Sequence, residues 1–204
     1  MIALALPWLA SLMTRDAAAI AAVAAAGRLP WLLFSVPAGV VVDRTDRRTL
    51  IARADLLRAA ITFAILLLAL SEPAGSVIWI LTGLAFLLGS AEVLRDNAAQ
   101  TILPSIVADG DLEAANGQMW SVEQLTGQFI GPPLAGILIA AGIGLPFGLD
   151  IAALVLAAGF VWLIAMQPPP PSELRFIQAL REGIGFMRGD PMLLRLAIVL
   201  GIAK

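Results

Sequence analysis

Long apolar stretches separated by short polar segments dominate this sequence, and several are long enough to cross a membrane. A transmembrane helix needs about 20 mostly apolar residues to span roughly 30 Å of hydrocarbon. The only charge between residues 124 and 172 is Asp150, and a glycine-rich turn divides that stretch. The pattern therefore predicts five complete spans. Two lie at residues 17–42 and 50–71, and a third starts with the uncharged run 73–91 and extends to Glu92, Arg95 and Asp96 near its end. The last two lie on either side of a turn at 140–148.

The two ends of the chain carry shorter apolar segments. Residues 1–13 would form a helix only about 20 Å long, so we interpret them as the second half of a truncated helix 1. A signal peptide is disfavoured because no basic region precedes the apolar run. The predicted organisation is a transmembrane bundle at 1–166, a cytoplasmic linker with an amphipathic helix at 167–190, and the start of helix 7 at 191–204. We expect the chain to be a piece of a larger protein.

Composition places the chain in the all-α integral membrane class. Hydrophobic residues make up 60% of the sequence and charged residues 14%, and the mean hydropathy is +0.92. The chain has no cysteine and no histidine, so thiolate ligands and the commonest metal ligand are both missing. We expect the lipid bilayer as a partner, no nucleic acid, no metal and no cofactor. Any proton chemistry must use carboxylates.

Basic residues predict which side of the membrane each loop faces. Short loops near residues 72–75 and 142–148 hold no lysine or arginine. Two of the alternate segments are basic, and such loops face the cytoplasm. The residues concerned are Arg44, Arg47, Arg48, Arg53, Arg58, Arg175, Arg181 and Arg188. The third alternate segment, at 101–114, carries only acidic charges and is expected on the same side, because acids count little in this rule.

One basic loop also contains an acid that topology does not explain. Asp43 ends an apolar run, where the negative end of a helix dipole disfavours a carboxylate by about 0.3–1 kcal/mol. The spacing reads G-x-x-x-D-R-x-x-R-R between two predicted spans, and it resembles the cytoplasmic loop signature between helices 2 and 3 of the major facilitator superfamily. Asp46 stands where that family usually has glycine. The residues of the signature are Gly39, Asp43, Arg44, Arg47 and Arg48.

The segment "GQFIGPPLAG" forms a second signature. Gly127, Gly131, Pro132 and Gly136 resemble the helix 5 pattern of antiporters in the same superfamily, with Ala135 in place of a usual glycine. Small residues four apart allow another helix to approach closely. The two adjacent prolines remove hydrogen-bond donors, which predicts a bend.

The resemblance extends over essentially the whole chain. The segments "GRLPWLLFSVPAGVVVDR" and "AEVLRDNAAQTILPSIV" are similar to the exporter branch that contains macrolide-efflux and siderophore-export proteins. It implies the N-terminal six-helix bundle of a major facilitator fold in a bacterial cytoplasmic (inner) membrane. It further implies a missing C-terminal half whose arginine and helix end pair with Asp43, latching the outward-open state.

Charged residues inside predicted spans are candidates for function because they are costly there. Glu123 is either a protonatable carboxylate or one half of a structural ion pair. Glu92, Arg95 and Asp96 favour structural pairing with one another or with the 43–48 loop, and direct proton transfer is the alternative. Arg28 either meets substrate or pairs with Glu123.

The sequence thus predicts a secondary active transporter rather than an enzyme. The expected activity is proton-coupled export of a small amphipathic compound, drug-like or siderophore-like, by alternating access. A stand-alone membrane scaffold or regulatory protein is one alternative. An integral membrane enzyme is disfavoured because the sequence lacks a phosphate-binding loop and a dense aspartate cluster for magnesium.

Overall fold

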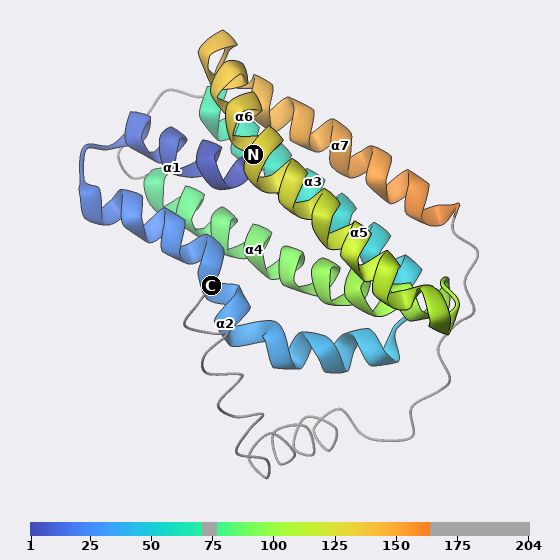
Figure 1. Ribbon diagram of the computed structural model, residues 1–204. Coiled ribbons are helices and arrows are strands. Elements are labelled where there is room, and N and C mark those ends of the chain that lie inside the picture. The colour runs from blue at the N-terminus through green and yellow to red at the C-terminus, as the bar shows by residue number, and fades with distance from the viewer. Residues whose placement is uncertain (71–76, 164–204) are drawn as a thin grey trace, which may run out of the picture.

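The computed structural model describes residues 1–70 and 77–163 and shows a bundle of helices (Figure 1). No strand occurs within these two ranges. The α-helices are α1 (Ile2–Met13), α2 (Ala17–Arg44), α3 (Arg47–Leu70), α4 (Val77–Ile102), α5 (Leu112–Gln124), α6 (Gly131–Ala141) and α7 (Leu145–Trp162). A π-helix, η3 (Leu125–Ile130), joins α5 to α6, and two 3₁₀ turns, η1 (Leu103–Ser105) and η2 (Asp109–Asp111), lie between α4 and α5. The predicted linker and helix 7 lie outside the described residues.

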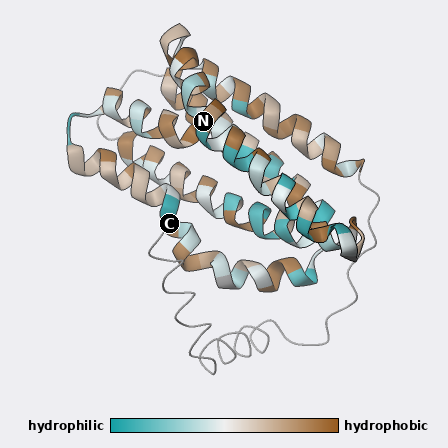
Figure 2. Cartoon of the chain, in the orientation of Figure 1, coloured by the Kyte–Doolittle hydropathy of each residue, from teal (hydrophilic) through white to brown (hydrophobic). Residues whose placement is uncertain are grey.

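Three of the described helices are long and apolar enough to cross a bilayer. They are α4, α7 and the Ala17–Ser35 part of α2. Figure 2 shows hydrophobic residues along most of the bundle, with hydrophilic residues gathered toward the end where α4 and α5 meet. The helices and their composition agree with the predicted all-α integral membrane class.

The main core forms where α1, α2, α3, α4 and α7 meet. Phe147, Leu9 and Ile65 are among its largest fully buried side chains. The backbones of α2 and α4 come especially close at Gly89. A Cβ added there would overlap the carbonyl oxygen of Gly27. Glycine at position 89 is therefore what lets these two helices cross in contact.

Side chains and glycines mark where the helices begin and end. The Asp16 carboxylate accepts a hydrogen bond of 2.9 Å from the Ala18 amide and caps α2. Asp46 caps α3 in the same way, through the Thr49 amide at 3.3 Å and the Thr49 hydroxyl at 2.5 Å. The predicted glycine-rich turn lies between α6 and α7, starting at Gly142.

The two prolines of α6 change the helix just before them. Neither Pro132 nor Pro133 can donate a backbone hydrogen bond. The preceding residues form the π-helix, in which the Gly131 amide binds the carbonyl of Thr126, five residues back. A widened turn thus stands where the sequence predicts a bend.

Candidate functional site

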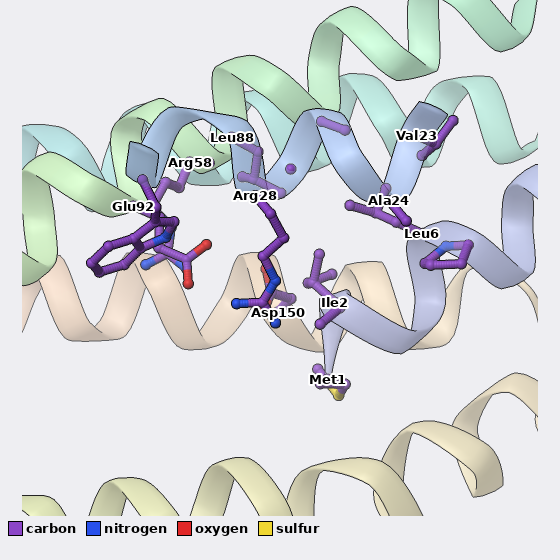
Figure 3. Close-up of a pocket in the computed structure, with 16 residues that line it drawn as sticks. Met1, Ile2, Leu6, Val23, Ala24, Arg28, Arg58, Leu88, Glu92 and Asp150 are labelled. Carbon is purple, nitrogen blue, oxygen red and sulfur yellow. The ribbon is translucent and has the colours of Figure 1, made fainter. Parts of the chain in front are cut away.

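A cavity of about 330 Å³ opens inside the bundle, between α1, α2, α3, α4 and α7. One part of its lining is apolar and includes Leu6, Val23 and Leu88, and Trp31 also contributes. Figure 3 shows Glu92 and Arg58 at one end of the cavity, Arg28 and Asp150 in its middle with Leu88 nearby, and Leu6, Val23 and Ala24 toward the other end. The lining is therefore amphipathic, as a pocket for an amphipathic molecule would be.

Four charged side chains line this cavity, and each comes from a different helix. Arg28 is on α2, Arg58 on α3, Glu92 on α4 and Asp150 on α7. Among the described residues, neither Arg28, Glu92 nor Asp150 lies within 4.0 Å of an oppositely charged side chain. Charges inside membrane spans are rare and mark functional sites by default. Arg28, Glu92 and Asp150 therefore bring charge to the cavity without an ion pair to a described side chain, whereas Arg58 is paired with Asp55.

Asp150, near the start of α7, lines the cavity. A position near the start of α7 predicts a carboxylate at the membrane interface. The structure places Asp150 in the cavity lining, and it accepts a hydrogen bond of 3.5 Å from the buried Thr62 hydroxyl. Because α7 packs along α3, this residue faces the cavity. Its interfacial position stays a prediction.

Beside the cavity, a buried charge cluster joins α3 to α4. Asp55 is 1% exposed, and its Oδ1 lies 3.4 Å from Arg58 Nη1 and 3.6 Å from Arg95 Nε. Arg95 also pairs with Asp96 at 3.1 Å. Asp55 falls in the first turns of the span predicted at residues 50–71, and its burial was not predicted. The available signal was an acid and a base three residues apart inside an apolar run.

The structure separates the three charged residues predicted to pair on α4. Arg95 and Asp96 do pair, but Glu92 turns to the cavity. The main partner of Arg95 from elsewhere in the chain is Asp55 of α3, rather than the 43–48 loop.

The 43–48 loop is tied to α7 through an arginine. The guanidinium of Arg48 lies 4.9 Å from the centre of the Trp162 ring, and its Nη1 donates to the Trp162 carbonyl oxygen at 3.5 Å. Asp43 is exposed and makes no ion pair with the described part of the chain. The hydrogen bonds from Thr49 hold the pKa of Asp46 below its usual range. Asp46 therefore acts as the N-cap of α3.

The residues of the second signature lie at the η3–α6 junction. Gly131 and Ala135 are buried, whereas Gly127, Pro132 and Gly136 are exposed. A Cβ at Gly131 would meet the Thr126 carbonyl oxygen at 2.9 Å and the Met1 nitrogen at 3.5 Å. The predicted close approach is therefore found at Gly131, where the start of α1 meets α6.

Glu123, the first candidate for a proton carrier, is exposed on α5. It does not line the cavity, and it forms no ion pair with Arg28. Across residues 1–70 and 77–163, no group of acidic residues has the arrangement of a metal site.

Comparison with known proteins gives consistent results. The sequence matches the family described as "transmembrane secretion effector" over residues 1–203. It is 31% identical over 204 residues to the multidrug efflux pump Tap of Mycolicibacterium fortuitum, covering 96% of this chain and 50% of that protein. It is 24% identical over 179 residues to macrolide efflux protein A of Enterococcus faecalis, covering 85% of this chain and 54% of the relative.

The chain thus spans about half the length of these curated relatives. No solved structure matches it.

Proposed function

Because the chain belongs to the transmembrane secretion effector family of the major facilitator superfamily, a family of transporters rather than enzymes, we propose that it forms half of an exporter. The helices would be the N-terminal six-helix bundle, with α1 as part of helix 1, α5 to α6 as helix 5 and α7 as helix 6. The other half would be a second bundle supplied by further sequence. The membrane would be the bacterial cytoplasmic membrane, as the bacterial relatives suggest.

The amphipathic cavity is the observation that carries this proposal. It combines apolar walls with unpaired charges from several helices, inside a bundle with helices long enough to span a bilayer. Such a site suits a small amphipathic compound, drug-like or siderophore-like, better than an inorganic ion. Relatives named for multidrug and macrolide efflux support a substrate of this class.

Transport would proceed by alternating access, with the 43–48 loop as a latch. Asp43 is exposed at the end of α2, where its own helix dipole disfavours it and no described residue neutralises it. An arginine or a helix N-terminus of the second bundle would supply the missing positive charge. Arg48, held against Trp162, would fix the loop to its own bundle.

Protons are the proposed coupling ion, because the chain places carboxylates within its helices. With no histidine in the chain, these carboxylates are the candidate proton carriers. Glu123 stays the first candidate for the proton carrier. Its exposed position on α5 would allow it to face the second bundle. Glu92 and Asp150 reach the cavity and are alternatives.

Transport by the intact protein in proteoliposomes tests this function. An imposed pH gradient should drive uptake of an amphipathic dye into inverted vesicles, and flux that ignores the gradient would refute proton coupling. Glu123→Gln should abolish gradient-driven transport and retain dye exchange. Glu113→Gln is the matched control, since Glu113 is another exposed carboxylate on α5. Loss of transport in both variants would argue against a specific role for Glu123.

A further inference from the structure

Asp55 is the counter-ion of two arginines that come from two different helices. A single oxygen, Oδ1, lies within ion-pair distance of Arg58 on α3 and Arg95 on α4. The other oxygen, Oδ2, is buried and has no hydrogen-bond partner among the described residues. Removing one member of a buried charge group leaves the others uncompensated, which is far costlier than losing a surface pair. Asp55 therefore neutralises charge on both arginines, and shares Arg95 with Asp96.

Only one of these arginines reaches the cavity. Arg58 belongs to its lining, whereas Asp55 and Arg95 do not. The side chain of Arg58 is 19% exposed, so it is partly open to the cavity while Asp55 holds it from behind. Asp55 can thus act on a bound molecule without touching it, by fixing the direction of Arg58 and offsetting its positive charge.

The other charges around the cavity make this offset consequential. Glu92 and Asp150 face the cavity from α4 and α7, and Arg28 faces it from α2. Together with the Asp55 cluster and the amino group of Met1, which also lines the cavity, three arginines and one amino group stand against four carboxylates, the fourth being Asp96. Loss of one carboxylate would shift this balance toward positive charge.

Building on the proposed function, we propose that Asp55 is a positioning residue that biases the cavity toward amphipathic cations over anions of the same shape. A unit charge about 10 Å from a bound ion, at an effective dielectric constant of about 20, changes the affinity of that ion roughly tenfold. The change has opposite signs for a cation and an anion.

Two ions of nearly equal shape and opposite charge test the proposal. The dissociation constants of tetraphenylphosphonium and tetraphenylborate would be measured by equilibrium dialysis on the intact protein in lipid nanodiscs. Asp55→Asn should weaken the cation about tenfold and strengthen the anion about tenfold. Glu113→Gln is the control, because it removes an exposed carboxylate on α5 that does not line the cavity. It should leave the ratio of the two dissociation constants unchanged.

A purely structural role for Asp55 would weaken both ions alike, and that result would overturn the proposal. If Asp55→Asn does not fold, Arg95→Gln is the second variant, because it removes a positive charge from the same cluster and leaves Asp55 in contact with Arg58. The ratio of its two dissociation constants should shift toward the cation, opposite to the shift expected for Asp55→Asn, and an unchanged ratio would contradict the charge argument. Failure of the wild type to bind either ion would refute the cavity as a ligand site, and with it the proposed function. Binding with an unaltered ratio in Asp55→Asn would refute only the role of Asp55.

Discussion

The crossing of α2 and α4 gives a sharp test of the packing around the cavity. In Gly89→Ala, the new Cβ would overlap the Gly27 carbonyl oxygen and lie 3.2 Å from Pro30 Cγ. The obstacle is helix backbone, so no rotamer change relieves it and the two helices must separate. Overpacking of this kind costs about 1–3 kcal/mol, against a gain of about 1 kcal/mol from replacing a helical glycine by alanine.

Gly83→Ala is the matched control on the same helix. A Cβ at Gly83 meets nothing within 4 Å, so this variant should keep the whole gain in helix propensity. The two variants differ by the overpacking cost alone, which corresponds to a melting temperature lower by roughly 2–12 °C for Gly89→Ala than for Gly83→Ala. Thermal unfolding followed by circular dichroism in detergent measures this difference. A Gly89→Ala protein as stable as the control would refute the close crossing.

Three further predictions concern the helix ends and the loop. Asp46→Ala should lower stability by about 1 kcal/mol in chemical unfolding through loss of the cap, and Asp46→Gly by only a few tenths; equal losses would argue against the cap. The bonds from Thr49 lower the pKa of Asp46, so the ionised carboxylate contributes fully to the free energy of unfolding above about pH 4, and this contribution is lost as the pH falls further. The free energies of unfolding of the wild type and Asp46→Asn should therefore converge in unfolding curves recorded at acidic pH. Arg48→Gln should lose the stacking on Trp162, worth about 0.5–1 kcal/mol, and redshift the tryptophan fluorescence maximum, whereas an unchanged spectrum would contradict the contact.

The fold was largely predictable because apolar runs and glycine turns are local signals. The span predicted at residues 17–42 corresponds to α2, which ends at Arg44, and the predicted turn contains Gly142. The two motifs also led to the right superfamily, which the family match confirms. The π-helix η3 was not predictable. A proline lacks the amide hydrogen that a helix needs, which predicts an irregular turn but does not say whether it is a bend or a π-helix.

The cavity and the Asp55 cluster required the structure. These helices are apolar on most of their surface, so hydrophobic periodicity does not reveal which face turns inward. Asp55 and Arg95 are 40 positions apart and meet only because α3 and α4 pack side by side. The same limit applies to Asp150, whose inward direction depends on how α7 is rotated against α3.

The weak attachment of α5 has a mechanical consequence. No residue of α5 or η3 is buried, whereas α6 directly behind them is held by Gly131 and Ala135. Within this half, α6 is therefore fixed by packing, whereas α5 presents a whole helix face to whatever lies beside it. Backbone amides of α5 should exchange hydrogen sooner than those of α4 in this half alone, and a second bundle packed on α5 should slow that exchange.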